Sequence, residues 1–490
     1  MACRKNTTPC HAWFVPCVML FFLFSCNRQA QKGDLFVPVA PDFNNQTVVL
    51  PEGFRYTVLF SEGDTVIAPD GRSAPARGSH DLVVYIPING SNEHGYLYVS
   101  HETHHPHPVL GDGGGATFFE VKKINGEWSV ISKLMSVDFS TVGGTIRNCG
   151  GTLTPHGTVL TAEEEFPMSN TELMLQNGIT DTSDINGRKK FLHFGYMVEV
   201  DMQSGKALRK LYGMGRYSHE DAHCMPDGKT VYLTSDSKPA VLFKFVADKA
   251  GDYSAGQLYA YAQSEDASGG RWIPLPMHPD SLMNITDVAL RLGAGMGIRH
   301  EWIDADGDKL YIAETGSDEF SFAREIKTGG KPFHYFAQLA TGTNTYKDNY
   351  GRILELDLKT NRLRVLLEGG VADKDSAFCF SNPDAITVAS IRGKKYLVIS
   401  EDNNGNTLGR VIAAARERGQ VYNEIYFLDL SVSHPTLRHL KRFMAAPEGC
   451  ETTGNCFTPD GKSYFVSIQH PSRSNTPPFN RSAVIAITGF

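Results

Sequence analysis

The chain repeats one short pattern five times: a potential metal ligand opens an apolar segment, a glycine turn follows, and a second strand returns. Short apolar runs punctuated by glycine are typical of β-hairpins. The ligand precedes the turn glycine by 6 to 10 residues in every copy. If the hairpins stand around a common axis, five ligands converge on one point, which predicts a polynuclear metal centre. The ligands are Cys149, Glu220, Glu301, Asp384 and Glu451, and the turn glycines are Gly157, Gly228, Gly307, Gly393 and Gly461.

A sixth hairpin, HDLVVYIPINGSNEHGYLYVSHE, precedes these five and ends at Glu102. The second strands of the six hairpins end 62 to 88 residues apart, and further strand-like segments such as YMVEVDM, RILELDL and NEIYFLDL fill the intervals. A long period built from several short strands predicts a β-propeller. We therefore expect an all-β fold, a six-bladed β-propeller forming one catalytic domain over residues 46–490, with a metal cluster on its central axis. Two β-sandwiches are the alternative, but they give no reason for the repeated units.

The repeated acids themselves argue for bound cations. Carboxylates gathered at the entrances of neighbouring strands would repel one another, and burial would raise their pKa values. Divalent or trivalent cations remove this conflict. One such acid alone would more readily cap a turn or pair with a nearby Arg or Lys, but five potential ligands in register favour a metal site.

The overall charge excludes one class of partner. The 490 residues carry a formal net charge of -7, and the sequence pI is about 6.2. No basic run indicates binding to nucleic acid. The composition is that of an ordinary globular protein, long enough to bury a core.

The N-terminus has the pattern of an export signal. A basic start precedes an apolar run at 13–24, which is short for a membrane span. Ser25 before Cys26 resembles a lipoprotein cleavage box. We therefore expect a signal peptide over 1–25, a lipid on Cys26 and a polar tether over 26–45; an ordinary signal peptide cleaved nearby is the alternative. The expected location is the cell envelope outside the cytoplasm, with membrane contact through the lipid alone.

Five cysteines follow Cys26. An odd number in an oxidising compartment leaves at least one unpaired or bound to metal. Cys224 and Cys379 stand among apolar residues and are expected to be core thiols. A bridge between Cys450 and Cys456 stays open from the sequence.

Five stretches of the chain resemble the PhoX-type alkaline phosphatases, a family of bacterial propeller proteins. The similarity runs from about Arg77 to the end of the chain, and several motifs in the same order make it specific. The resemblance implies a propeller fold, hydrolysis of phosphate esters, and the cofactors Fe³⁺ and Ca²⁺. The stretches are GTIRNCGGTLTPHGTVLTAEE, GRYSHEDAHCMPDGKTVYLTSD, GIRHEWIDADGDKLYIAETGSD, FSNPDAITV and GCETTGNCFTPDGKSYFVSIQHPS.

The resemblance also implies roles for individual residues. Cys149 matches a thiolate that bridges two irons, and Arg299 matches an arginine that faces the phosphate, so these are the expected catalytic residues. Glu163 and Glu164 match paired glutamates that bind calcium, although neighbours in an extended strand point to opposite faces. The expected metal ligands are Cys149, Glu163, Glu164, Glu220, Asp236, Glu301, Asp384 and Glu451.

Four features depart from the family pattern. His156 replaces a bulky aromatic, Ala162 replaces a cysteine before the glutamate pair, and His300 replaces a proline between Arg299 and Glu301. These three changes are expected to alter the fit to substrate. The start differs from the family's usual twin-arginine signal, so a lipoprotein exported by another route would assemble its metals after export.

Residues and resemblance together predict a metal-dependent phosphatase that hydrolyses phosphate monoesters, and some diesters, outside the cytoplasm. Metal ions can supply the nucleophile, neutralise phosphate charge and stabilise the leaving oxygen, while arginine donates a fixed fork to phosphate oxygens. The expected partners are small phosphate esters, and the protein is expected to be a monomer. The alternatives are a calcium-dependent propeller lactonase or esterase, which has no use for Cys149, and a non-catalytic propeller anchored at the surface.

A histidine-rich patch follows the sixth hairpin. Its separations could support zinc, but Pro106 and Pro108 indicate an irregular loop, so a surface loop or the rim of the site is favoured. The patch consists of His101, His104, His105 and His107.

Overall fold

The computed structural model describes residues 34–40, 45–371, 379–402 and 423–490. The chain divides into two compact units, Met1–Val37 and Pro38–Phe490, and everything below concerns the second. The expected signal peptide and Cys26 lie outside the described residues. Within the described ranges, no helix is long and apolar enough to cross a membrane.

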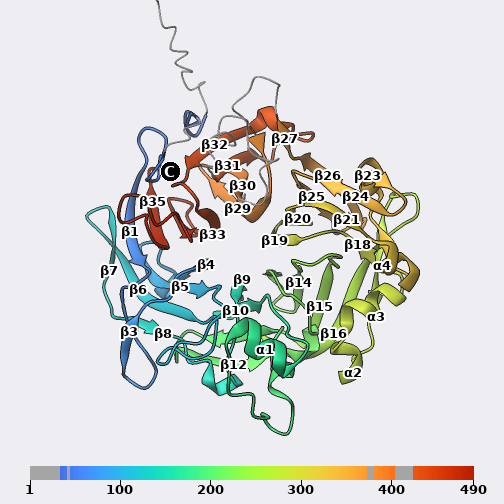
Figure 1. The fold of residues 1–490 in the computed structure, drawn as a ribbon. Coiled ribbons are helices and arrows are strands. Elements are labelled where there is room, and N and C mark those ends of the chain that lie inside the picture. Colours follow the sequence, from blue (N-terminus) through green and yellow to red (C-terminus); the bar gives the residue numbers. More distant parts are fainter. Residues whose placement is uncertain (1–33, 41–44, 372–378, 403–422) are drawn as a thin grey trace, which may run out of the picture. The chain divides into compact units, whose positions relative to one another are not determined.

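Six sheets of at least four strands dominate the larger unit and surround a common centre (Figure 1). Their strands pair antiparallel, except that β2 (Thr65–Ile67) pairs parallel with β8 (Leu134–Ser136). The innermost strands of neighbouring sheets pack against one another in chain order, and the sixth packs against the first, so the ring is closed. This is the propeller-like, mostly β architecture that the sequence predicts, and it does not fit two sandwiches. The innermost strands are β4 (His80–Pro87), β9 (Asn148–Leu153), β13 (Ala222–Cys224), β19 (His300–Asp306), β29 (Pro383–Ile391) and β33 (Glu451–Phe457).

Each sheet runs outward from its innermost strand. The second strands are β5 (His94–His101), β10 (Thr158–Glu163), β14 (Thr230–Leu233), β20 (Lys309–Glu314), β30 (Lys394–Glu401) and β34 (Ser463–Gln469). The third strands are β6 (Ala116–Ile124), β11 (Met197–Asp201), β15 (Phe243–Lys249), β25 (Arg352–Asp357), β31 (Glu424–Asp429) and β35 (Ala483–Thr488). The fourth strands are β8 (Leu134–Ser136), β12 (Lys206–Lys210), β16 (Asp252–Gln263), β26 (Arg362–Glu368), β32 (Leu440–Ala445) and β1 (Arg55–Ser61).

Strand β1 joins the two ends of the unit. It comes from the N-terminal side and pairs antiparallel with β35, so the last sheet contains strands from both ends of the chain. Further strands extend the sheets or form small ones: β2 (Thr65–Ile67), β3 (Ser73–Pro75), β7 (Glu127–Val130), β17 (Gly270–Pro274), β18 (Gly295–Met296), β21 (Ser317–Ser321), β22 (Lys331–Pro332), β23 (Ala340–Gly342), β24 (Thr345–Asp348), β27 (Gly370–Val371) and β28 (Cys379–Phe380).

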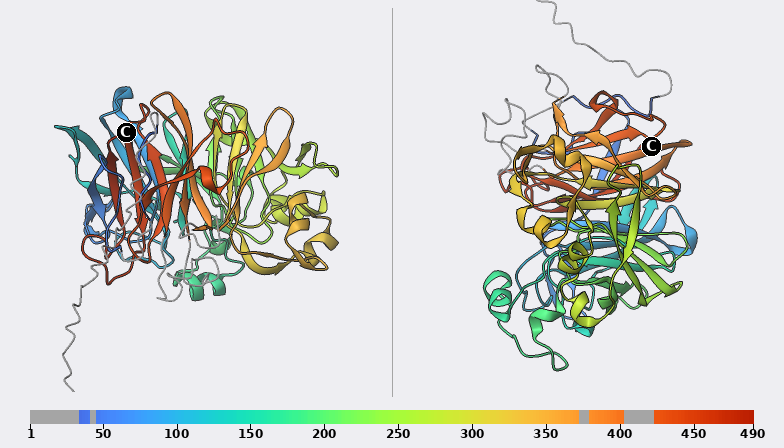
Figure 2. Two further views of the ribbon diagram at one scale, coloured as in Figure 1. Left: turned by 90° about the horizontal axis from the view of Figure 1, so that it is seen from above. Right: turned by 90° about the vertical axis from the view of Figure 1, so that its right-hand side faces the viewer.

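In the part of the chain that the structure describes, helices are few and short. Figure 2 shows α1, in green, projecting beyond the sheets. The α-helices are α1 (Asn170–Asn177), α2 (Pro279–Leu282), α3 (Ile285–Arg291) and α4 (Ala323–Thr328). The 3₁₀ turns are Ile88–Gly90, Ser140–Val142, Lys190–His193, Tyr212–Met214, His334–Gln338 and Leu437–His439.

The core lies between neighbouring sheets. Alternate residues of β20 enter different apolar clusters: Leu310 and Ile312 enter one, and Tyr311 and Ala313 enter another. Side chains of a strand point alternately to its two faces, so both faces of this sheet are covered. The apolar runs of the sequence are continuous for this reason, and β34 is buried along its whole length.

Candidate active site

A cavity of about 450 Å³ lies where the innermost strands begin, and its lining is charged or polar throughout. Nine carboxylates and two arginines line it, so the formal charge of these groups is 2 - 9 = -7. The lining residues are Ser79, Asp81, Glu102, His104, Arg147, Glu164, Glu220, Asp236, Arg299, Glu301, Asp384, Asp402, Glu451 and His470.

Irregular backbone pairing sets the direction in which several of these acidic side chains point. The register shifts between His80 and Val83 in β4, and equivalent shifts in β19 and β29 span Glu301 and Asp384. Asp81, Glu301 and Asp384 therefore lie within β-bulges, which redirect side chains next to functional sites.

Glycines let the innermost strands approach closely. A Cβ on Gly150, directly after Cys149, would lie 2.6 Å from the Glu220 carbonyl oxygen. A Cβ on Gly454 would lie 2.1 Å from the Asp81 carbonyl oxygen. Any larger residue at these positions would push apart the strands that carry the site.

Two groups of ligand atoms meet at Glu220. Atoms of Asp81, Cys149 and Glu220 all lie within 4.8 Å of one another, and so do atoms of Glu220, Glu301 and Asp384. All five residues are buried. Carboxylates suit hard cations such as calcium, and a thiolate suits iron, so the donor set fits a mixed cluster bridged at Glu220.

The acids strongly oppose one another's ionisation. Burial first, and then the charge of Glu301, raises the pKa of Glu220 well above its usual range. Burial raises the pKa of Asp81 to about 7. Burial and then the neighbouring Glu451 raise the pKa of Asp384. Cations at this position would stabilise the ionised carboxylates. The sequence analysis predicts this same need for cations among gathered acids.

Cys149 is a free, buried thiol. Its Sγ lies 3.2 Å from the Glu220 carbonyl oxygen and 3.3 Å from that of His219. Burial, followed by the charge of Glu220, raises its pKa well above the usual range. Cys450 and Cys456 are free thiols, so no disulfide joins them in this structure.

Arg299 contacts two of the expected ligands. Its Nε donates to Asp236 Oδ1 over 2.8 Å, and its Nη2 lies 3.0 Å from Glu301 Oε1. Its backbone φ is +46°, in the left-handed region that non-glycine residues seldom adopt. The structure therefore places Arg299 in the cavity, where it also balances acid charge.

The adjacent glutamates separate, as alternation along a strand requires. Glu164 lines the cavity, with its Oε2 2.7 Å from Arg147 Nη2. Glu163 is not among the cavity-lining residues; its Oε1 lies 2.7 Å from Lys210 Nζ, and the N–H groups of Gly195 and Tyr196 donate to its Oε2. The structure therefore places Glu164 in the cavity wall and Glu163 beside Lys210, outside the lining.

Glu451 also lines the cavity, and His470 Nε2 lies 3.0 Å from its Oε2. The structure thus brings Cys149, Glu164, Glu220, Asp236, Glu301, Asp384, Glu451 and Arg299 to one end of the ring, and leaves Glu163 apart.

Sequence reasoning missed several lining residues. Asp81 stands at the start of the hairpin that precedes the other five, as Glu301 stands at the start of its own hairpin. Each acid directly follows a histidine. Glu102 and Asp402 follow second strands, in the manner of Glu164. The signal in the sequence is their position: each stands at the same place in its hairpin as a residue that was predicted to be a ligand.

Three family departures lie outside the cavity lining. His156 is exposed at a turn, Ala162 is in the core, and His300 is buried 3.4 Å from Glu314 Oε2. None of these three residues lines the cavity, so none is placed to change the fit of a substrate by direct contact. Of the histidine-rich patch, His104 does reach the rim, with Nδ1 3.1 Å from Glu165 Oε1.

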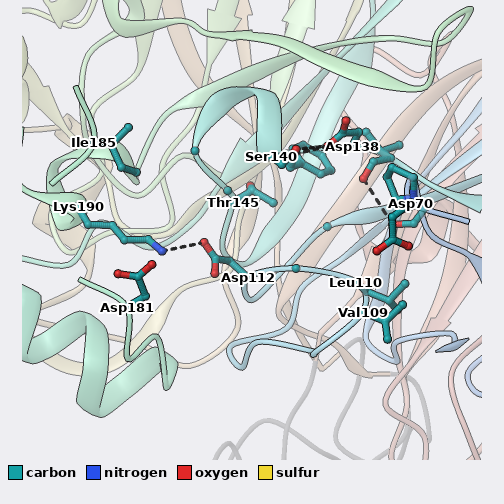
Figure 3. Close-up of a pocket in the computed structure, with 18 of the residues that line it drawn as sticks. Asp70, Val109, Leu110, Asp112, Asp138, Ser140, Thr145, Asp181, Ile185 and Lys190 are labelled. Atoms are coloured by element: carbon teal, nitrogen blue, oxygen red, sulfur yellow. Dashed lines mark hydrogen bonds and ion pairs between the residues drawn. The ribbon is translucent and has the colours of Figure 1, made fainter. Parts of the chain in front are cut away.

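A second hollow of about 600 Å³ is larger but chemically different (Figure 3). It shares no lining residue with the acidic cavity. Its carboxylates have local partners: Lys190 lies 3.4 Å from Asp112, and the Ser140 hydroxyl donates to Asp138 over 2.5 Å. Of these two, the hollow in Figure 3 is the larger, but the convergence of buried ligands selects the acidic cavity as the candidate active site.

Comparison with known proteins decides the family. The family model described as "Alkaline phosphatase PhoX" matches residues 35–472. The chain belongs to the PhoX alkaline phosphatase family. PhoX membership makes the protein a phosphatase, and it sets aside the lactonase and non-catalytic alternatives.

One solved structure in particular shares the fold of the chain. The chain is similar to Pseudomonas fluorescens PhoX in complex with vanadate, a transition state analogue, with TM-score 0.69, 20% identity, and coverage of 93% of this chain and 98% of that chain. Looser likenesses include the pyranose dehydrogenase PQQ domain of Coprinopsis cinerea (TM-score 0.41, 10% identity, 90% and 97% covered) and a putative 6-phosphogluconolactonase of Bacteroides fragilis (TM-score 0.35, 14% identity, 81% and 80% covered). No curated protein matches the chain.

Proposed function

We propose that this PhoX-family phosphatase hydrolyses phosphate monoesters, and some diesters, with an iron–calcium cluster on the axis of a six-bladed propeller. The proposal depends chiefly on the position of Glu220. Its carboxylate belongs both to the group of ligand atoms that contains Cys149 and to the group that contains only carboxylates. A ligand shared by a thiolate site and an oxygen site supports a cluster of unlike metals.

The residues present fit such a cluster. Nine carboxylates against two arginines leave a large negative charge that protein groups alone do not balance. Cys149, Glu220 and Asp81 would hold iron, and Glu164, Asp236, Glu301, Asp384 and Glu451 would complete the calcium sites. When bound, the cations supply Lewis acidity and neutralise phosphate charge.

Arg299 would bind the substrate phosphate. A guanidinium presents several N–H donors in a fixed fork that matches two phosphate oxygens. Its contacts with Asp236 and Glu301 hold the guanidinium at the cavity wall before substrate arrives, so little reorganisation is needed.

The proposed location is the cell envelope outside the cytoplasm, with a lipid on Cys26, a tether over 26–45 and a monomeric catalytic domain. The support is the sequence of the first residues alone.

Elemental analysis of the purified protein, combined with phosphate release from a panel of organic phosphates, tests the proposal. We expect iron and several calcium ions per chain, release from monoesters, and inhibition by vanadate, the ligand of the P. fluorescens structure. Calcium without iron in a fully active enzyme would contradict the mixed cluster.

A further inference from the structure

The residue two positions before each innermost ligand can be compared around the ring. These residues are Ser79, Arg147, Ser218, Arg299, Asn382 and Gly449. Arginine occurs at two of the six, before Cys149 and before Glu301. Arg147 precedes the second sheet of the ring and Arg299 precedes the fourth. The third sheet, whose innermost strand follows Glu220, lies between them.

The two arginines have similar backbone conformations and equivalent backbone hydrogen bonds. Arg147 has φ +40° and Arg299 has φ +46°. The Arg147 N–H donates to Thr103 O over 3.2 Å, and its carbonyl accepts from Glu164 N over 3.1 Å. The corresponding bonds of Arg299 go to Ser237 O (2.9 Å) and come from Thr315 N (3.1 Å).

The same left-handed backbone occurs at three more of the six positions, with φ +48° at Ser79, +51° at Asn382 and +72° at Gly449, so this conformation belongs to the repeated unit. At Arg147 and Arg299 this shared conformation places a guanidinium on the wall of the same cavity. Arg147 is thus the positional equivalent of Arg299.

The side chain of Arg147 retains donor capacity. Its Nη2 pairs with Glu102 and lies 2.7 Å from Glu164 Oε2, and its Nη1 lies 3.5 Å from Glu165 Oε1. Its buried Nε has no hydrogen-bond partner among the described residues.

We propose that Arg147 is a second phosphate-binding residue, which donates to the phosphoryl group in the same cavity as Arg299. The inference rests on the proposed function, because it assumes that phosphate enters this cavity. Two guanidiniums would hold a dianionic phosphoryl group more selectively than one, which favours monoesters over singly charged diesters.

The test is the affinity of the metal-loaded protein for inorganic phosphate, measured by titration calorimetry with metal content determined on the same samples. We expect Arg147→Ala to bind phosphate roughly 10- to 100-fold more weakly, the range for hydrogen bonds to charged groups, with iron and calcium unchanged. Added guanidinium should restore part of the affinity. Arg72→Ala, which removes an exposed guanidinium paired with Asp70 outside the cavity, should bind like the wild type.

A double variant separates phosphate binding from charge balance. Arg147→Gln combined with Glu165→Gln removes one charge of each sign, so it would restore phosphate affinity if Arg147 only balanced acids. Wild-type affinity in that double variant, or in Arg147→Ala, would overturn the inference. A wild-type protein that neither binds phosphate nor hydrolyses monoesters would instead overturn the proposed function, and this inference with it.

Discussion

The Arg299 guanidinium and the Asp236 carboxylate form a direct ion pair, with 2.8 Å between Nε and Oδ1. The pair joins the inner entrance of one sheet to the end of a second strand in the preceding sheet, across the cavity wall. Arg299 can therefore act in two ways, on substrate or on the acids alone, and mutation can tell these apart.

Replacing Arg299 by lysine keeps the charge but removes bidentate donation. We expect turnover to fall by roughly 10²-fold, the scale for one preorganised donor, with a smaller change in KM and unchanged metal content. Steady-state kinetics and elemental analysis of the same preparation check this. If lysine sustains normal turnover while Arg299→Ala loses metal, the residue only balances acid charge.

Replacing Cys149 by serine should remove iron and abolish phosphate release, because the hydroxyl is a far poorer ligand for iron than a thiolate. The fold should persist, since the change is nearly isosteric in a buried position. Circular dichroism and elemental analysis report these two outcomes. A disulfide at Cys149 in the active enzyme would refute its assignment as a ligand.

Replacing Asp81 by asparagine should lower metal content and activity, because its carboxylate lies within 4.8 Å of the ligand atoms of Cys149 and Glu220. Glu163→Gln is the contrasting variant: it should leave metal content per folded chain intact but destabilise the protein by about 3–5 kcal/mol, since buried Lys210 would lose its partner. Loss of cavity metal in Glu163→Gln would restore that residue to the ligand set.

Removing the metals should make stability fall as pH rises. The pKa of Asp81 is raised to about 7 in the folded chain, chiefly by burial, and burial also raises the pKa of Glu220 well above its usual range. Between the unfolded value near 4 and the folded value, the folded state binds more protons, so its stability decreases with increasing pH. For Asp81 alone the scale is roughly 4 kcal/mol. Melting temperatures of chelator-treated protein should therefore drop between pH 5 and pH 8 more than those of the metal-loaded form. An equal pH dependence of the two forms would mean that the cavity holds no cations.

The fold and most of the site follow from the repeated hairpins. Ligand, strand and glycine turn are local features, so the innermost strands and five of their entrance residues could be predicted from the sequence. The side to which a residue points at a bulge is not local, because it depends on the register with the next strand. Glu163 and Glu164 illustrate this limit: only the fold shows that Lys210, 47 residues away, meets Glu163.

Asp81 and Arg147 show a second limit. Both hold positions equivalent to those of recognised residues, Glu301 and Arg299, yet neither position carries a ligand type or motif that is distinctive by itself. Their significance comes from closure of the ring, which brings the first, second and fourth sheets to one cavity.

The most direct test of the account is phosphate release from a phosphate monoester by the protein as purified, after chelation, and after return of iron and calcium. We predict release by the purified protein, its loss on chelation, and recovery only when both metals are supplied. Undiminished release from protein shown to contain neither iron nor calcium would contradict the central claim.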